Sequence, residues 1–544
     1  QFEGDRSVDE YLGIPFAEPP LNNKRFMPPQ EYQNKPTASS PFRASTPAKT
    51  CPQDLFNTGI YAFDFWNPPK DTISEDCLQL NMWVPKNPTG AVLVNLCGGA
   101  YWRLGASADI FNGSVLAAYS RAIVVNLNFR LGALGFARSK NSSIFGNMGL
   151  LDQQMGLKWI KENIKDFGGD PEKVTLMGEQ TGASSAQAHL YAKNSTGLFK
   201  RIALTSGVLE NPWASRSNRF EEKSTEILAN LLNCTSAKKS EHPKVNLKCL
   251  QEKNYREILN ATAVLKKSLG LTFGFPFSLI FKDGEFFENN FTREQPNIDN
   301  VDILMGNTKD EGSFFLWYYF KETAKCDLNT KAQPMTGSCK VSESAFNTIV
   351  QNVSDIYGKS ETWQNNVKSK YGGSKEDKTE AANKLLTDLL FDCGLKQFAD
   401  NITESKVNEP YVYDFRHRSK EISTTWPESF GTVHAALIEF LFGRPFRYPS
   451  NYKNEDGTLE KEKQMSQKIM ELYGKFANEG KPAEGWEPYK TGSKKIMMLN
   501  DYFDSTTKSY SYKETEYGSN CDWLINRFEQ EVRMPKKPTK RATA

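Results

Sequence analysis

The chain lacks the features that identify several large classes of protein. It has four histidines among 544 residues, and three of them show no ligand spacing with cysteine or acidic residues, so we expect no metal and no cofactor. Its 68 Lys and Arg nearly balance 65 Asp and Glu, which excludes a polyanion binder that works through overall charge. No nucleic-acid motif is present, so we expect no nucleic-acid partner. No apolar run approaches the roughly 18 residues of a membrane-spanning helix, so we expect no membrane span.

What the chain does have is enough apolar material for a large core. Apolar residues make up 38% and aromatic residues 12%, which is too much for a disordered chain. At about 150 residues per domain, the length alone would predict three or four domains. The sole clear shift in composition is the basic end at 535–544. We expect this tail to be a solvated terminus; the alternative is a docking segment for an acidic partner.

Short apolar runs bounded by turn residues alternate with amphipathic stretches along the chain. Such runs are typical of a parallel sheet buried on both faces, and they predict strands at 91–97, 121–128, 173–177, 201–206, 301–306 and 410–415. Apolar residues spaced three and four apart predict helices at 150–166, 182–193, 217–232, 343–357, 377–400 and 460–479. The alternation predicts an α/β fold with a doubly wound, mostly parallel sheet.

Cysteines and glycosylation sequons indicate the compartment. The chain has nine cysteines, and N-x-[ST] occurs at Asn112, Asn141, Asn194, Asn233, Asn260, Asn290, Asn352 and Asn401. Each sequon alone is weak evidence, but eight of them beside several plausible cysteine pairs favour an oxidising compartment. We therefore expect a glycoprotein of the secretory pathway, either secreted or held in a membrane-bound vesicle.

The most informative segment, 167–185, places a predicted strand, a glycine-flanked turn and a predicted helix in succession. The turn reads Gly178-Glu179-Gln180-Thr181-Gly182, in the strand–turn–helix context of a G-x-S-x-G nucleophile elbow. The glycines let the chain turn sharply and aim the central side chain out of the sheet. That side chain is Gln180, whose neutral amide has no ionisable proton for a histidine to remove. The elbow therefore lacks its nucleophile.

Other motifs, in the same order, resemble those of the type-B carboxylesterase/cholinesterase family. They are GIPFAEPP at 13–20, SEDCLQLN at 74–81, NFRLG at 128–132 and GNMGLLDQ at 146–153. The resemblance covers almost the whole chain and implies an α/β-hydrolase fold, with a central, mostly parallel sheet flanked by helices and long insertions. It also implies one domain over 1–534, followed by the basic tail, in place of three or four domains.

The resemblance locates the other members of the family's catalytic triad. The family's acid lies in a D-E-G turn after a strand and matches Glu311, and its histidine precedes an apolar helix and matches His434. In a working triad the histidine would be the base and the acid would orient it. Without a serine at Gln180 the pair is a relic, and we expect it to hold two loops together.

The family's oxyanion hole is altered as well. Its first two glycines match Gly98 and Gly99, but the third position is Ala100, and the amide after the nucleophile belongs to Thr181. A single engineered change at Gln180 would not explain the other two, so natural loss of function is preferred. We predict no significant esterase activity.

Several aromatic residues resemble those of a cholinesterase gorge. Trp66 resembles the tryptophan that stacks on the cation of choline, while Trp213, Phe314 and Glu179 match other positions around the gorge. The alternative for each aromatic is plain core packing. If a gorge persists, we expect it to bind a small cationic or apolar molecule.

The resemblance implies three disulfides, Cys51–Cys77, Cys234–Cys249 and Cys393–Cys521. Spacing alone does not give connectivity. Cys326 and Cys339 remain as a further pair, and Cys97 is left over. We expect Cys97 to be a buried cysteine at a strand end; the alternative is a reactive thiol in the vestigial site.

With catalysis discounted, the family's non-catalytic members suggest two roles. The first is a structural, storage or self-assembling, crystal-forming glycoprotein, because a net charge near zero favours self-association. The alternative is a cell-surface adhesion or recognition ectodomain, which would need an anchor in a longer precursor. A residual enzyme that uses Glu311 and His434 without a nucleophile ranks last.

Overall fold

A computed structural model describes residues 6–524 except 38, 58–59, 61–63, 237–243, 270–274, 288–299, 333–334, 405–408, 420–425, 453–456, 502, 504–510 and 513–519. The sequon at Asn290 and the basic tail at 535–544 therefore lie outside the described residues.

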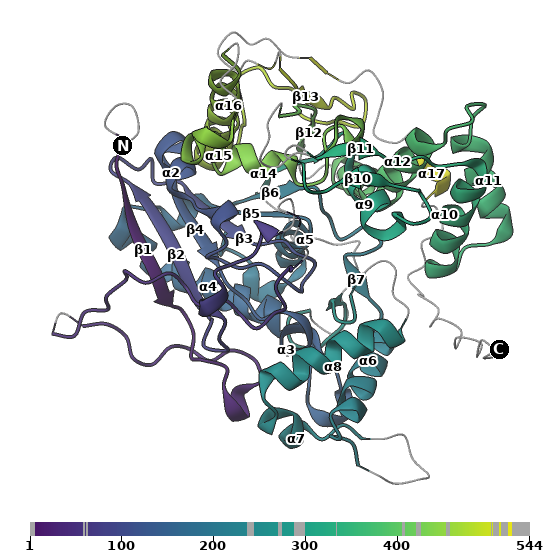
Figure 1. Cartoon of the computed structure of the whole chain (residues 1–544). Helices are drawn as coiled ribbons and strands as arrows, with labels where there is room; N and C mark the ends of the chain where they lie inside the picture. The colour runs from purple at the N-terminus through teal and green to yellow at the C-terminus, as the bar shows by residue number, and fades with distance from the viewer. Residues whose placement is uncertain are drawn as a thin grey trace.

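The centre of the molecule is a nine-stranded sheet (Figure 1) with strand order β1-β2-β4-β3-β5-β6-β9-β12-β13. All pairings from β4 to β13 are parallel, while β1 and β2 form an antiparallel edge. The strands are β1 Val8–Pro15, β2 Gln79–Pro85, β3 Val92–Leu96, β4 Ile123–Leu127, β5 Val174–Glu179, β6 Arg201–Thr205, β9 Asp302–Thr308, β12 Tyr411–Phe415 and β13 Met497–Leu499. This architecture confirms the predicted mostly parallel α/β sheet, and all six predicted strands are present. Strands β1, β2 and β13 escaped prediction because they lack long apolar runs.

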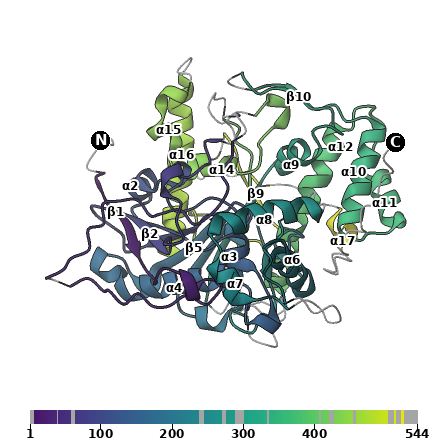
Figure 2. The ribbon, with the colours of Figure 1, turned by 60° about the horizontal axis from the view of Figure 1, so that its bottom comes forward.

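Helices cover both faces of the sheet (Figures 1 and 2). Within the described residues the α-helices are α2 Ser114–Ser120, α3 Gly132–Phe136, α4 Met148–Asn163, α5 Thr181–Ala188, α6 Asn218–Leu231, α7 Leu247–Glu252, α8 Tyr255–Ser268, α9 Glu311–Phe320, α10 Glu343–Ile356, α11 Glu361–Tyr371, α12 Thr379–Thr387, α13 Cys393–Glu404, α14 Ala436–Leu441, α15 Arg444–Arg447, α16 Thr458–Glu479 and α17 Cys521–Leu524. The helix predicted at 377–400 is α12 and α13 joined by a π-helical turn at Asp388–Asp392. Short strand pairs lie outside the sheet: β7 Ser215–Arg216 with β8 Leu279–Ile280, and β10 Asp327–Asn329 with β11 Thr336–Ser338.

The buried strands supply side chains to a separate core on each face. In β3, Val94 and Leu96 join the core that includes α4 and α5, while Leu93 joins the core beneath α2, α14 and α16. This alternation follows from the two-residue period of a strand. A third core lies among α9, α10, α11 and α12, which gather away from the sheet beside α17 (Figure 1). The long insertions therefore carry their own apolar packing.

Four disulfides link the chain: Cys51–Cys77, Cys234–Cys249, Cys326–Cys339 and Cys393–Cys521. They comprise the three pairs implied by the resemblance and the further pair. Cys97 is a buried free cysteine just beyond β3, and burial raises the pKa of its thiol. Because the thiolate is the reactive form, this placement matches an inert strand-end cysteine.

Most of the described sequons lie on the surface. Asn141, Asn194, Asn233, Asn260 and Asn401 are exposed, whereas Asn112 and Asn352 are half-buried. Within the described residues, no helix combines the length and apolar character needed to cross a bilayer.

Candidate functional site

The elbow has the strained geometry that its sequence predicts. Gln180 lies between β5 and α5 with φ +52° and ψ −115°, a conformation that costs a non-glycine residue about 1–3 kcal/mol. Neighbouring glycines make room for it: a Cβ on Gly182 would lie 2.0 Å from the Leu96 carbonyl oxygen, and one on Gly207 would lie 2.1 Å from that of Gln180. The surrounding backbone thus holds the Gln180 side chain beyond the carboxyl end of the sheet.

The Gln180 side chain occupies its own oxyanion hole. Its Oε1 accepts hydrogen bonds from the backbone N–H of Gly99 at 3.2 Å and of Ala100 at 3.1 Å. Ala100 takes a left-handed φ of +65°, which the family's glycine at this position would adopt without strain. The two converging donors are the groups that would stabilise an acyl-transfer oxyanion. Here they hold a neutral amide oxygen that is part of the chain.

The other two predicted oxyanion-hole residues have different contacts. A Cβ on Gly98 would lie 2.5 Å from the backbone oxygen of Glu179 and 2.5 Å from its Oε2, so Gly98 provides space for Glu179. The hydroxyl of Thr181 accepts a hydrogen bond from the Tyr101 N–H at 3.2 Å. The second donor to Gln180 is therefore Ala100, and Gly98 makes the close approach to Glu179 instead.

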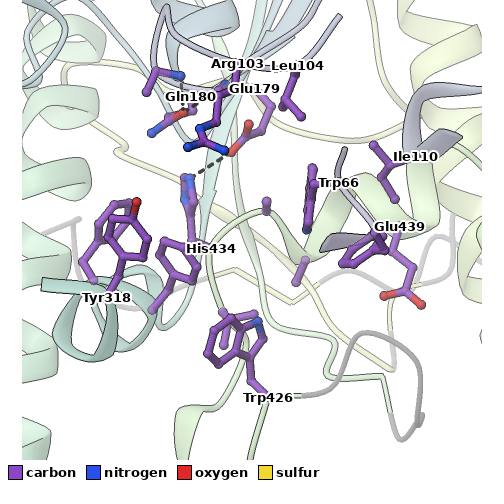
Figure 3. A pocket seen from close by; sticks show the side chains of 18 of the residues that line it. Trp66, Arg103, Leu104, Ile110, Glu179, Gln180, Tyr318, Trp426, His434 and Glu439 are labelled. Atoms are coloured by element: carbon purple, nitrogen blue, oxygen red, sulfur yellow. Dashed lines mark hydrogen bonds and ion pairs between the residues drawn. The ribbon is translucent and has the colours of Figure 1, made fainter. Parts of the chain in front are cut away.

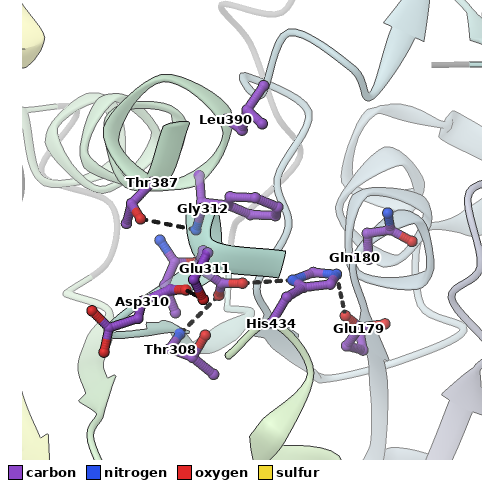
Figure 4. A network of polar contacts seen from close by, with 12 residues as sticks. Glu179, Gln180, Thr308, Asp310, Glu311, Gly312, Thr387, Leu390 and His434 are labelled. Atoms are coloured by element: carbon purple, nitrogen blue, oxygen red, sulfur yellow. Dashed lines mark hydrogen bonds and ion pairs between the residues drawn. The ribbon is translucent and has the colours of Figure 1, made fainter. Parts of the chain in front are cut away.

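His434 lies between two carboxylates (Figure 4). Its Nδ1 is 2.5 Å from Glu311 Oε2, and its Nε2 is 3.0 Å from Glu179 Oε1. Glu311 begins α9 just after β9 and accepts the Thr308 N–H at 2.8 Å through Oε1. The structure brings Gln180, Glu311 and His434 into one site, but Nε2, the nitrogen that would face a nucleophile, is paired with Glu179.

The two carboxylates fix the protonation state of His434. Burial by itself would lower the pKa of the imidazole, but the nearby charges of Glu179 and Glu311 outweigh it and raise the pKa to about 10. At neutral pH the ring is therefore an imidazolium, hydrogen-bonded to Glu311 through Nδ1 and ion-paired with Glu179 through Nε2. In this protonation state the ring has no lone pair with which to accept a proton.

An aromatic cavity of about 200 Å³ opens in front of these groups (Figure 3). Of the predicted gorge residues, Trp66, Glu179 and Phe314 line it. Trp213 has a different position: its indole N–H donates to the Leu390 carbonyl oxygen at 2.7 Å, and its ring packs against Phe391. Phe391 in turn lies 5.0 Å from the His434 ring, centroid to centroid, so Trp213 supports the site from behind.

Sequence reasoning missed the cations of this cavity. Arg103, Lys266 and Arg418 all contribute to its lining, together with Trp102, Tyr318 and Trp426. The three cations come from the loop after β3, from α8 and from the segment after β12. No motif or periodicity connects these segments, and only the fold brings them together. Within the described part of the chain, no three His, Cys, Asp or Glu side chains cluster as a metal site would require.

A glycine-flanked elbow at the carboxyl end of a mostly parallel sheet, followed by an acid after β9 and a histidine after β12, defines an α/β-hydrolase fold. The model of the carboxylesterase family matches residues 1–518, and the chain belongs to that family.

Two acetylcholinesterases are among its relatives. The chain is 33% identical to acetylcholinesterase of Bungarus fasciatus over 514 residues, which are 91% of this chain and 80% of that protein. It is 31% identical to acetylcholinesterase 4 of Caenorhabditis briggsae over 513 residues, covering 88% of this chain and 78% of the relative. The four disulfides fit a protein of the secretory pathway.

Proposed function

We propose that the protein is a non-catalytic member of the carboxylesterase family that serves as a structural, storage or self-assembling glycoprotein. The observation that carries the loss of catalysis is the Gln180 side chain, which replaces the nucleophile and places its amide oxygen on the Gly99 and Ala100 amides. Acyl transfer needs a nucleophile, a free base and an empty oxyanion hole.

Each of these requirements is opposed by a separate feature of the site. The amide of Gln180 offers no nucleophilic oxygen with a removable proton. The charges of Glu179 and Glu311 favour the protonated form of His434. The two oxyanion-hole donors are occupied. Because groups of a catalytic triad act as a unit, losing the serine alone costs about a million-fold in turnover in another hydrolase.

A covalent probe tests this loss directly. We expect a fluorophosphonate, which labels activated serines, to leave the protein unlabelled after hours under conditions that label the Bungarus fasciatus acetylcholinesterase to completion. Stoichiometric labelling that maps to any serine near the cavity would contradict the proposal. Denatured protein serves as the control for non-specific labelling.

Self-association is supported by the near-zero net charge of +3, while the five exposed sequons support the glycoprotein part of the proposal. The Asn- and Lys-rich composition and the lost serine resemble those of the slime-mould crystal protein within this family, and storage in a vesicle would suit such a role. Light scattering against concentration and pH tests it: reversible growth of ordered assemblies is expected. A particle of fixed size that captures a partner ectodomain would favour the adhesion alternative instead.

Residual ligand binding in the cavity is a second candidate function. It is favoured by the retained aromatic lining around Trp66, Phe314 and Trp426 and by the roughly 200 Å³ of space. A binding site needs no nucleophile, so the changes at Gln180 leave this candidate untouched.

A further inference from the structure

We infer that the cavity takes an amphiphilic organic anion, a carboxylate on an aromatic or aliphatic body, and that Arg103 and Lys266 bind the carboxylate. This inference deepens the residual ligand binding proposed above and rests on it. It is independent of the proposed self-assembly.

Arg103 contributes a guanidinium group to the lining of the cavity. It lies on the loop after β3, and its guanidinium stacks over the Phe56 ring with Cζ 4.0 Å from the ring centroid. Its Nη1 is buried and has no hydrogen-bond partner among the described residues. A buried donor without a partner is costly, and burial lowers the pKa of Arg103, although Asp54 and Tyr318 partly offset this. An anion in the cavity would remove that cost.

Lys266 adds a second positive charge to the same wall. It projects from α8 into the cavity lining, with its ammonium 5.7 Å from the Phe275 ring centroid. Burial lowers its pKa, and repulsion from Arg103 lowers it further. Two like charges held near one another in partly buried surroundings repel unless an anion lies between them. The pair therefore has the electrostatics of a site that favours a carboxylate.

The acids of the cavity do not compensate these cations. Glu179 is engaged by His434 at 3.0 Å, and Glu439 accepts a hydrogen bond from the Tyr452 hydroxyl. A third cation, Arg418, also lines the cavity; its guanidinium donates to backbone carbonyl oxygens, which are neutral. The cavity thus presents more available positive than negative charge, so an anion is favoured over a quaternary ammonium cation.

The remaining lining is suited to the apolar body of such a ligand. Trp66, Phe314 and Trp426 form aromatic walls, and Phe314 packs edge-on against Trp426 at 5.4 Å. Tyr318 stacks on Phe314 at 5.5 Å and is 36% exposed, so it reaches solvent. Arginine guanidinium groups bind carboxylates through paired N–H donors, while the aromatic surface gains from burying apolar area.

Three ligands of one shape and different charge test the inference. Calorimetric titration would compare 3-phenylpropanoate, 3-phenylpropanol and trimethyl(2-phenylethyl)ammonium on the full chain at low ionic strength. We expect the anion to bind about tenfold or more tightly than the neutral alcohol, because hydrogen bonds to charged groups contribute more than neutral ones. We expect the cation to bind more weakly than the alcohol.

Two variants assign the effect to the proposed groups. Arg103→Met and Lys266→Met remove a charge but keep an apolar stem, so each should reduce anion affinity several-fold and leave the alcohol unchanged. Unchanged alcohol binding shows that the cavity remains folded. Lys267→Met is the matched control, because Lys267 is the exposed neighbour on α8, and it should alter none of the affinities.

The outcomes separate failure of the charge assignment from failure of ligand binding. Equal affinity for the anion and the alcohol, tighter binding of the cation, or an anion affinity unaffected by Arg103→Met would each overturn the anion inference. Absence of binding by all three probes at millimolar concentration would overturn both the inference and the candidate function on which it rests. The proposed loss of catalysis would stand in either case.

Discussion

Replacing Glu179 by glutamine should lower the pH at which His434 loses its proton. Burial favours the neutral ring, and the charges of Glu179 and Glu311 together overcome this and raise its pKa from 6.5 to about 10. At about 1.4 kcal/mol per pKa unit, this rise corresponds to an upper limit of about 5 kcal/mol in favour of the imidazolium. Removing one of the two carboxylates should lower the pKa of His434 by about 2 units.

The same shift makes stability depend on pH in a defined direction. Because the folded-state pKa of His434 is raised, its contribution to folding is fully present below the unfolded value of 6.5 and is lost as the pH rises toward about 10. In Glu179→Gln, the loss should be complete at a lower pH. Denaturant unfolding at pH 6, 8 and 9.5 would measure the difference between the two proteins.

Histidine NMR provides the direct assay, because the chain has only four histidines. Protein labelled at the imidazole ring should show one signal that is absent from His434→Gln and that titrates near pH 10. In Glu179→Gln this signal should move toward neutral pH. Glu439→Gln is the matched control, since Glu439 lines the same cavity but bonds to the Tyr452 hydroxyl. If the signal assigned to His434 titrates between pH 6 and 7 in the wild-type protein, the reasoning is refuted.

Three further predictions concern the elbow, the glycine packed against it and one disulfide. Gln180→Ala removes the acceptor of two backbone amides and should cost about 1–2 kcal/mol of unfolding free energy, whereas Gln180→Gly should recover about 1 kcal/mol because glycine tolerates the positive φ. Gly207→Ala should cost roughly 2–3 kcal/mol, since its Cβ would lie 2.1 Å from the backbone carbonyl oxygen of Gln180. Its control, Gly492→Ala, has open space around the new Cβ and should change stability by less than about 0.5 kcal/mol. Replacing Cys393 and Cys521 by serine opens a link across 128 residues and should cost about 4–5 kcal/mol. Urea unfolding midpoints measure all three, and equal stability of Gly207→Ala and Gly492→Ala would contradict the tight elbow.

The sheet could be predicted because its information is local. Each of β3, β4, β5, β6, β9 and β12 is a short apolar run, and the elbow is a contiguous motif with glycines at fixed positions. The edge strand β1 and its neighbour β2 could not be found in this way, because polar or charged residues such as Asp9, Glu10 and Asn81 interrupt their apolar runs. Period and composition therefore identify the buried centre of the sheet better than its edge.

The chemistry of the site was only partly predictable. The motif order located Gln180, Glu311 and His434. It did not show that the side-chain oxygen of Gln180 accepts a hydrogen bond from the Ala100 N–H, or that Glu179 pairs with Nε2 of the histidine. Both contacts depend on side-chain conformation across loops. The cavity cations were likewise invisible, since each is contributed by a segment distant in sequence from the others.

Ester hydrolysis measured on wild type beside His434→Gln tests the central claim most directly. If the site is disabled, hydrolysis of an activated aryl ester should be slow and equal in the two proteins across pH 6 to 10, because neither has a serine for the histidine to activate. Saturable turnover by the wild type that is lost in His434→Gln would show a working base and would contradict the account.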